Sequence, residues 1–419
     1  MARWMRLVLT VVVLAATIAA PAWARTELTM WYHSGQAEER AVLLDQVARF
    51  NAAHPDIFIR AVEIPEGSYN EQVQAAALAG DLPDILDLDG PMIANYVWAG
   101  MLLPLDDFVS PELKSDLLPS ILAQGTYEGR LYALGVFDAG LGIWGNRRYL
   151  EDVGARIPQS VEDAWTFTEF MDVLDRLKAH PEVRYPLDFK VNYGVGEWFT
   201  FGFSPIFQAF GADLIDRSTM DRAQGVVNGP AARAAGAWLQ SLFELGYANP
   251  NPPGDTEFID GSAALSWVGH WMWPQYSSEL GDDLVLLPMP KFMRQVTGTG
   301  SWAWSITRNA ADPAAAWKFI EFLLQPEEIV KMTDANGAVP SRLSAARMSA
   351  NYQPGGPLSL YVEQLQTIGL ERPVTPAYPA ISAYFAEAID NIIHGAPVGP
   401  ELDRVAENIE MELAFMGLR

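Results

Sequence analysis

The spacing of apolar residues in the first part of the chain switches between the period of a β-strand and that of an α-helix. Residues 28–33, 57–64 and 83–88 are short apolar runs or show the two-residue alternation of β-strands, and turn-forming residues bound them. Residues 38–51 and 69–79 place apolar side chains at the spacing of one helical face. This strand–helix order predicts an α/β fold with a parallel sheet covered by helices on both faces.

The rest of the chain continues the α/β pattern. Residues 131–134 and 141–144 are expected strands, and the connector 135–140 between them is a candidate crossing between domains. A mature chain of nearly four hundred residues is too long for one hydrophobic core, so two or three domains are expected. Further helices are expected at 161–179, 204–210, 230–245 and 313–324, further strands near 262 and at 303–307, and a mainly helical tail at 357–417.

The first residues have the composition of a secretory signal peptide. Arg3 and Arg6 precede an uncharged apolar run at 7–20, and Ala22 and Ala24 provide a cleavage site after residue 24. The apolar run is shorter than the ~20 residues that a membrane-spanning helix needs. Because the chain has no cysteine, it can form neither a disulfide nor a lipidated N-terminal cysteine. The sequence therefore predicts a cleaved, unlipidated protein of the periplasm.

The net charge of the chain argues against two classes of partner. The formal net charge is -24, and removal of the two signal-peptide arginines makes it -26. Such an acidic surface repels phosphate backbones and anionic lipid headgroups, so neither nucleic acid nor a membrane surface is an expected partner. The 14 tryptophans are a more specific feature, because large flat rings stack on ligands.

Signatures of catalysis are missing from the sequence. It has no nucleophile elbow, phosphate loop or His-Glu-x-x-His motif, and its five histidines lack metal-ligand spacing. No metal and no cofactor is expected, and the chain is not expected to be an enzyme. Asp87, Asp89 and Asp138 leave a secreted glycosidase open, because glycoside hydrolysis needs two carboxylates that face one bond.

Aromatic residues beside polar ones recur at predicted strand ends and loops. Ligands of open α/β sheets bind outside the carboxyl ends of the strands, so such loops from two domains would face each other across a cleft. Aromatic rings match the C–H faces of a pyranose, while carboxylates and amides pair with its hydroxyl groups. A sugar site is therefore the favoured interpretation. The segments are 31–34, 87–90, 137–138, 198–203, 267–273, 300–304 and 378–384.

Ordered fragments along the chain are similar to those of one known family. They include His54-Pro55-Asp56-Ile57, Ala79-Gly80-Asp81-Leu82-Pro83-Asp84-Ile85 and Gly337-Ala338-Val339-Pro340-Ser341-Arg342. Each fragment is weak alone, but their order along the chain is specific. On this basis the chain resembles the extracellular solute-binding proteins, the family that contains the maltose-binding and glycerol-3-phosphate-binding proteins. The other matching fragments are 28–33 with 38–51, 98–105, 127–134 and 315–323.

The resemblance implies a two-lobed periplasmic binding protein fold that closes about a hinge. On the family pattern, 25–136 and 305–340 form one lobe, and 137–304 and 341–419 form the other. The resemblance also implies a sugar as ligand, the permease subunits of an ABC transporter in the inner membrane as partners, and a monomer.

The family pattern also implies ligand-binding residues. Asp138 matches a sugar-contacting carboxylate, and Trp271 falls where the family stacks an indole on its ligand. Gly90 and Pro91 depart from the maltose-binding pattern, so a different sugar is expected. The expected ligand-binding residues are Trp31, His33, Ser34, Asp87, Asp89, Gly90, Phe137, Asp138, Trp198, Phe201, Trp271, Gly300, Trp302, Arg372 and Tyr378.

Two other ligand classes stay open for the same fold. Clustered aromatic rings and carboxylates could cage a cationic polyamine. A glycerol phosphate would need cationic partners, and among the candidate residues only Arg372 offers a matched guanidinium.

Overall fold

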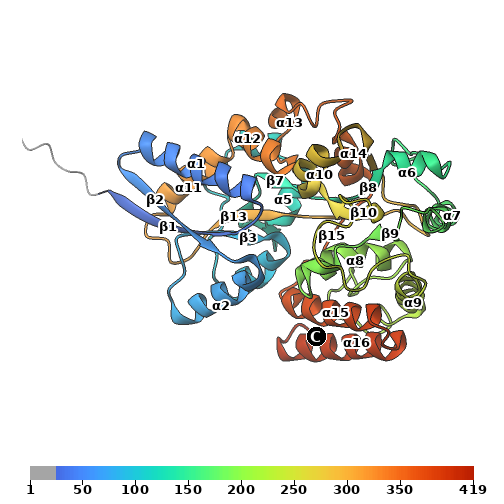
Figure 1. The fold of residues 1–419 in the computed structure, drawn as a ribbon. Coiled ribbons are helices and arrows are strands. Elements are labelled where there is room, and N and C mark those ends of the chain that lie inside the picture. The colour runs from blue at the N-terminus through green and yellow to red at the C-terminus, as the bar shows by residue number, and fades with distance from the viewer. Residues whose placement is uncertain (1–24) are drawn as a thin grey trace, which may run out of the picture.

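The structure is a computed structural model that describes residues 25–419 and contains two separate larger β-sheets (Figure 1). The predicted signal peptide at 1–24 lies outside the described residues. We call the part around the five-stranded sheet the first lobe and the part around the four-stranded sheet the second lobe. The two lobes lie side by side in Figure 1.

The sheet of the first lobe is mixed, with the order β2-β1-β3-β13-β6. Strand β1 runs parallel to β2 and β3, while β13 is antiparallel to both of its neighbours. The expected parallel sheet is confirmed for β1, β2 and β3, but β13 does not follow it, because it arrives from the second lobe without the helical crossover that a parallel strand needs. The strands are β1 Thr26–His33, β2 Ile57–Ile64, β3 Ile85–Asp89, β13 Trp302–Ile306 and β6 Ala133–Leu134.

Helices cover both faces of this sheet (Figure 1). On one face Met30 packs in a cluster with Phe50 of α1 and Phe319 of α11. On the other face Leu86 packs in a cluster with Val73 of α2. The longer helices are α1 Ala37–Ala53, α2 Tyr69–Ala79, α11 Pro313–Leu323 and α12 Pro326–Asn336; the shorter elements are α3 Ile93–Trp98, α4 Pro111–Asp116, α5 Pro119–Gly125, β4 Thr126–Tyr127, β5 Arg130–Leu131 and α13 Leu343–Met348.

The sheet of the second lobe has the order β11-β8-β10-β9. Strand β8 is antiparallel to β10 and β11, and β9 runs parallel to β10. Every residue of β8 and β10 is buried, because helices lie on both faces. The elements are β8 Leu141–Asn146, β9 Tyr185–Asp188, β10 Ala263–Gly269, β11 Leu284–Leu287, α6 Arg147–Asp152, α7 Phe167–Lys178, α8 Glu197–Ala209, α9 Pro230–Glu244, α10 Trp273–Leu280, α14 Ser359–Thr367, α15 Tyr378–Ile393 and α16 Val398–Phe415.

The chain passes between the two sheets at several short segments. Residues 135–140 connect β6 of the first sheet to β8 of the second, as the sequence analysis expects, and contain β7 (Phe137–Asp138). Residues 300–301 connect β12 (Thr297–Thr299) to β13. Strand β12 pairs with β15 (Gly369–Glu371), and β7 pairs with β14 (Val339–Pro340). These crossings place residues 137, 138 and 300 beside both lobes.

Two predicted helices begin at other residues than expected. The helix expected from 161 begins at Phe167, because Thr166 and Glu169 form a capping box that fixes its first turn. The helix expected from 204 begins at Glu197 and keeps Pro205 in its interior. Eleven residues of this helix, Phe199–Ala209, are buried, so tertiary packing offsets the ~3 kcal/mol that an interior proline costs.

The family resemblance implies that Asp87 and Asp89 lie in the loop after the third strand, and the structure differs. Asp87 and Asp89 belong to β3 itself and not to the loop after it. Pairing with β13 extends the strand to its last residue, since Asp87 lies opposite Trp304 and Asp89 opposite Trp302. The two carboxylates therefore sit on a rigid strand end.

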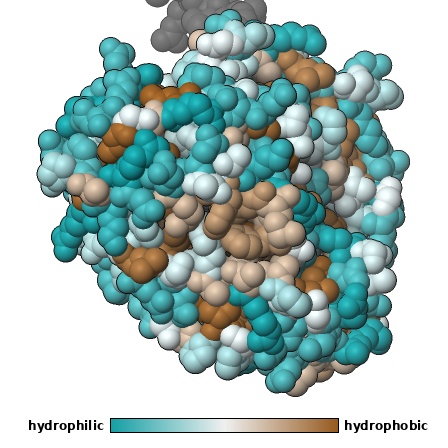
Figure 2. Space-filling view, turned by 90° about the vertical axis from the view of Figure 1, so that its right-hand side faces the viewer, coloured by the Kyte–Doolittle hydropathy of each residue, from teal (hydrophilic) through white to brown (hydrophobic). Residues whose placement is uncertain are grey.

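Figure 2 shows the side of the molecule on which α6, α7 and α9 lie in Figure 1. Hydrophilic residues cover most of this face, with a patch of apolar residues near its centre. Exposed apolar side chains of the second lobe include Phe167, Leu245 and Met293. Within 25–419, no helix is both long enough and apolar enough to cross a membrane.

Candidate functional site

Most of the expected ligand-binding residues meet where the two lobes face each other. The first lobe contributes the carboxyl ends of β1 and β3 and the start of β13. The second lobe contributes the first turn of α8, the turn η4 (His270–Met272) and the segment from Arg372 to α15. Carboxyl ends of parallel strands are the usual ligand-binding edge of an α/β sheet, so the site lies where this architecture favours one.

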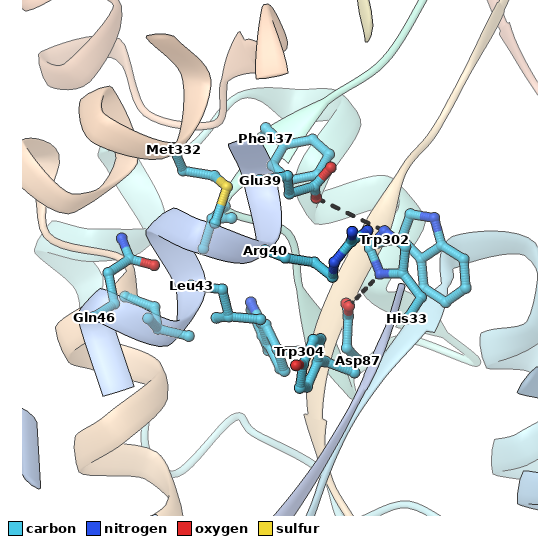
Figure 3. A pocket seen from close by; sticks show the side chains of 13 residues that line it. His33, Glu39, Arg40, Leu43, Gln46, Asp87, Phe137, Trp302, Trp304 and Met332 are labelled. Carbon is cyan, nitrogen blue, oxygen red and sulfur yellow. Dashed lines mark hydrogen bonds and ion pairs between the residues drawn. The ribbon is translucent and has the colours of Figure 1, made fainter. Parts of the chain in front are cut away.

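On the first-lobe side, His33 lies between an indole and two carboxylates (Figure 3). Its ring stacks on Trp302 with the centroids 3.8 Å apart and an interplanar angle of 6°. Nδ1 of His33 lies 2.6 Å from Asp87 Oδ2, and Nε2 lies 3.7 Å from Glu39 Oε1. Burial by itself would lower the pKa of His33, but attraction to Asp87 and Glu39 raises it to about 9. His33 is therefore an imidazolium at neutral pH.

A cavity of about 20 Å³ lies beneath this group. It is lined by residues of β1, α1, α12 and the crossing 135–140, among them His33, Gln46, Met332 and Phe137 (Figure 3). The volume suffices for about one water molecule. A sugar-sized ligand therefore cannot enter this cavity. The side chains that could contact such a ligand are those at the junction of the two lobes.

Arg372 joins the two lobes through two carboxylates. Its Nη2 donates to Asp89 Oδ1 at 3.0 Å and its Nη1 donates to Asp89 Oδ2 at 3.1 Å, which is a bidentate pair. Nη1 also donates to Glu197 Oε1 at 2.6 Å, at the first turn of α8. Burial raises the pKa of Asp89 to about 6, although the attraction of Arg372 acts in the opposite direction.

Glu197 also accepts hydrogen bonds from other side chains of the second lobe. The hydroxyl of Tyr378 donates to its Oε1, and Ser382 Oγ donates to its Oε2 at 2.6 Å. Tyr378 is fully buried and packs in the same cluster as residues of α2 and α3, so the start of α15 contacts the first lobe directly. Asn95 Nδ2 strengthens this contact by donating to the carbonyl of Pro376 at 2.7 Å.

Aromatic rings of the second lobe form a wall beside this network. Trp198 and Trp271 meet edge to face with their centroids 5.8 Å apart, and Phe201 lies 6.1 Å from Trp271. The guanidinium of Arg372 lies 4.9 Å from the centre of the Phe201 ring. A Cβ on Gly269 would lie 2.0 Å from the Trp271 indole, so this glycine allows the ring to approach the backbone.

The crossing segments are tied together by polar contacts. Asp138 is fully buried, and its Oδ1 accepts from the amides of Ala139 at 2.8 Å and Gly300 at 3.2 Å. Gly300 has a φ of +103°, which favours glycine, and its carbonyl lies 3.5 Å from Arg372 Nη2. Phe137 pairs with Pro340 in the neighbouring two-stranded sheet. Burial raises the pKa of Asp138.

Gly90 belongs to the same crossing region. Its amide donates to the carbonyl of Ser301 at 3.0 Å, and a Cβ at this position would lie 2.2 Å from Gln124. Gln124 in turn holds Ser301 through both ends of its amide, at 2.5 and 2.9 Å. Gln124 and Gly90 therefore fix the turn that carries Gly300.

Trp31 and Ser34 lie apart from this group. Trp31 packs against the cluster that contains Tyr69, and Ser34 Oγ accepts from the amide of Glu66 at 3.2 Å. Within the described part of the chain, no hydrogen bond or ring contact joins either residue to the Arg372 network.

Glu197 was not expected from the sequence. Trp198 and Phe201 were assigned to a loop, although both lie in α8, and Tyr378 was assigned to a loop although it begins α15. A correct start for α8 would have placed an acidic residue in the first turn of a helix, directly before a candidate aromatic residue. The sequence therefore contained evidence for Glu197, but Pro205 argued against a helix that runs from residue 197 through residue 205.

The site has no features of a metal centre. Across residues 25–419, no group of three or more His, Asp or Glu side chains could hold a metal ion. The carboxylates at the lobe junction are instead paired with His33 and Arg372.

Two lobes joined by short crossings, with ion pairs and aromatic rings at their junction, are the architecture of the two-lobed periplasmic binding protein fold. A family model described as bacterial extracellular solute-binding protein matches residues 34–329. The chain belongs to this family, so the resemblance drawn from the sequence is confirmed. The family and the relatives below are named as binding proteins and not as enzymes.

Relatives of known name are distant. The chain is 21% identical over 316 residues to the maltotriose-binding protein of Pyrococcus abyssi. The matched residues are 73% of this chain and 64% of that protein. It is 23% identical over 350 residues to the mannitol-binding protein of Pseudomonas aeruginosa, which covers 79% of this chain and 78% of that protein.

Solved structures share the fold. The GacH receptor of Streptomyces glaucescens, described unliganded and in complex with acarbose, superimposes with a TM-score of 0.78 at 20% identity and covers 94% of this chain and 98% of that one. This likeness confirms the expected two-lobed α/β fold.

Proposed function

We propose that this protein binds an uncharged sugar, a di- or oligosaccharide or a glycoside, at the junction of its two lobes in the periplasm. It delivers this ligand unchanged to the permease subunits of an ABC importer in the inner membrane. The ligand lies between the aromatic wall of the second lobe and the strand ends of the first, and the protein acts as a monomer.

The observation that carries this proposal is the combination of half-buried indoles with the ion-paired carboxylates Asp87 and Asp89. Trp198, Trp271 and Trp302 are half-buried, so parts of their rings are available for stacking on a sugar face. Asp87 and Asp89 are each ion-paired already, with His33 and Arg372. Paired carboxylates keep free lone pairs that accept hydrogen bonds from sugar hydroxyl groups.

The same pairing argues against charged ligands. A polyamine that used Asp87 or Asp89 would have to displace His33 or Arg372, and a phosphate that used Arg372 would have to displace Asp89 or Glu197. Either exchange leaves a buried charge without its partner, at a cost of several kcal/mol. An uncharged ligand avoids this cost.

Relatives support a polyhydroxylated ligand without fixing its identity. One is named as a maltotriose-binding protein, another as a mannitol-binding protein, and a neighbour of the same fold binds acarbose. Those ligands share closely spaced hydroxyl groups but differ in ring and length. We therefore propose the sugar class and not one saccharide.

The domain boundaries belong to the same proposal. From the sequence, 25–136 with 305–340 and 137–304 with 341–419 form the two lobes. Because β13 (Trp302–Ile306) pairs with β3 in the sheet of the first lobe and α13 packs against α12, residues 302–304 and 343–348 would move with the first lobe, with 135–140 and 300–301 among the hinge segments. Short crossings between two sheets are suited to hinge motion, because a few residues there can absorb the change in backbone angles.

A ligand screen tests the function. Thermal unfolding in the presence of sugars, polyols, polyamines and glycerol phosphates should show a higher melting temperature with at least one sugar and with none of the charged compounds. Stabilisation by a charged compound alone, or by none of the panel, would contradict the proposal.

Trp271→Ala sharpens the test. Loss of a buried aromatic contact should weaken sugar binding at least about 30-fold in titration calorimetry, since such truncations cost ~2 kcal/mol or more. Trp238→Ala is the matched control, because Trp238 is a half-buried tryptophan on α9 and packs with Phe210 and Phe292, away from the junction. An unchanged dissociation constant in Trp271→Ala would remove this residue from the site.

A further inference from the structure

A fully buried lysine lies in the second lobe behind the aromatic wall. Lys190 follows β9, has no solvent exposure, and adopts a φ of +53°. A non-glycine residue in the left-handed region is strained, and burial of an ammonium group is costly. The surrounding structure must therefore hold this residue strongly.

Its ammonium group has a full set of acceptors. Nζ lies 2.8 Å from Asp188 Oδ2, 3.3 Å from Asp255 Oδ1 and 3.2 Å from the carbonyl oxygen of Asp255. Three acceptors match the three N–H donors of a lysine. Its Nζ also lies 5.5 Å from the centre of the Tyr276 ring. Burial by itself would lower the pKa of Lys190, but the attraction of Asp188, Tyr193 and Asp255 together with the hydrogen bond to Asp188 raises it, so the group stays charged.

This ion pair fastens two segments to each other. The loop that contains Asp255 is held against the turn η3 (Val191–Tyr193), because Asn192 Nδ2 also donates to Asp255 Oδ1 at 3.0 Å. The amide of Lys190 donates to Asp188 Oδ1 at 2.8 Å, which ties the same turn to the end of β9. Lys190, Asp188 and Asp255 thus fix the position of η3.

The last residue of η3 contacts the aromatic wall. The hydroxyl of Tyr193 accepts from Trp271 Nε1 at 3.2 Å and lies 3.3 Å from the sulfur of Met272. The Tyr193 ring also meets Trp198 edge to face with the centroids 5.2 Å apart. Tyr193 therefore connects the turn beside the buried lysine to both indoles, and Trp198 Nε1 also donates to the carbonyl of Phe189, next to Lys190, at 3.3 Å.

Buried ion pairs are weak sources of stability, and apolar residues of similar volume often do as well. A strained and buried lysine is thus poorly explained by stability alone. The connection through Tyr193 gives it another role, because the orientation of an indole decides whether its face can stack on a ligand.

We propose that Lys190 is a positioning residue for the ligand site: its pairing with Asp188 and Asp255 fixes Tyr193, and Tyr193 fixes the plane of the Trp271 indole. The effect on affinity rests on the proposed sugar-binding function, but the effect on the indole does not. No direct contact between Lys190 and the ligand is involved.

The first measurement needs no ligand. In the ¹⁵N-labelled full chain, the indole N–H resonance of Trp271 is assigned by its disappearance in Trp271→Phe. Tyr193→Phe removes the acceptor of this N–H, and Lys190→Met removes the charge that holds η3, so both variants should shift the resonance and speed its exchange with solvent. The control Arg49→Met removes a cation paired with the buried Glu328 in the first lobe and should leave the resonance unchanged.

The second measurement is the dissociation constant for the sugar found in the screen. Lys190→Met and Tyr193→Phe should each weaken binding about tenfold, the equivalent of ~1.4 kcal/mol. Because both act through one path, the double variant should bind about as well as either single variant. Arg49→Met should lower the melting temperature without changing the affinity.

The outcomes separate the two proposals. If no sugar binds the unaltered protein, the proposed function fails, while the indole resonance still tests the positioning role. If the resonance and the affinity are unchanged in Tyr193→Phe and Lys190→Met, the positioning role is wrong. Should Lys190→Met fail to fold, Asp255→Asn loosens the same pairing from its partly exposed end and must shift the Trp271 resonance for the proposal to hold.

Discussion

The two sides of the candidate site are built in different ways. On the first-lobe side, His33, Asp87 and Trp302 come from ends of adjacent strands, and the imidazolium lies against its carboxylate partner within one lobe. On the second-lobe side, Glu197 and Trp271 come from a helix start and a short turn, and their environment depends on distant segments. Arg372 then pairs with a carboxylate on each side.

The two sides of the site differ in how their side chains are held in place. Strand ends inside a sheet are held by backbone ladders, so the His33–Asp87 pair is formed within the first lobe, and only Asp89 depends on the other lobe for its cation, Arg372. The second-lobe side presents rings whose orientation depends on side-chain contacts such as that of Tyr193 with Trp271. A binding protein that closes about a hinge can thus keep one fixed and one adjustable surface.

Removal of Arg372 should have the largest effect. Arg372→Met leaves Asp89 and Glu197 without their shared cation in a buried place, and the loss of one partner of a buried pair costs about 3–5 kcal/mol. Urea-induced unfolding measures the change in free energy. Asp89→Asn in the Arg372→Met background should recover part of the loss, and its failure to do so would show that Asp89 does not depend on Arg372.

A pH titration of stability tests the first-lobe side next. The native pKa of His33 is raised to about 9 from an ordinary value of 6.5, so its contribution is fully present below pH 6.5 and is lost as the pH rises through 9. The loss between pH 6.5 and 9.5 should be about 3 kcal/mol. It is measured as the free energy of unfolding at several pH values.

His33→Gln is the control for this titration. Glutamine keeps a polar side chain but does not titrate, so the variant should be less stable at pH 6.5 and should lose little more by pH 9.5. An equal loss in His33→Gln and the unaltered protein would assign the pH dependence to other groups.

Asp138→Asn should have the smallest effect. The amide oxygen of asparagine can accept the same two hydrogen bonds, from the amides of Ala139 and Gly300. The substitution also removes a negative charge that burial already disfavours. The free energy of unfolding should change by less than about 1 kcal/mol. A larger loss would mean that the charge of Asp138 itself holds the crossings together, and a loss of sugar affinity alone would mark it as a ligand contact.

Much of the fold could be predicted from the sequence because its signals are local. The strand at 57–64 and the helix at 69–79 match β2 and α2 residue for residue, and α11 begins at residue 313 as expected. The errors arose where local signals conflicted with packing. Pro205 disfavours a helix interior, yet α8 runs through it because the helix is buried almost completely.

The candidate site was harder to predict, because its contacts are long-range. Arg372 is 283 residues from Asp89 and 175 from Glu197, and no local pattern reports such pairings. The expected roles of individual residues as ligand contacts stay predictions, and Trp31 and Ser34 lie outside the connected group.

The sequence by itself determined the α/β class, the family and the presence of a two-lobed chain, since periodicity and ordered motifs are properties of neighbouring residues. Only the tertiary structure decided that Glu197 shares Arg372 with Asp89, and that a buried lysine lies behind the Trp271 indole. The physical reason is that charge pairing and ring packing depend on distance in space, which chain crossings between two sheets set independently of distance in sequence.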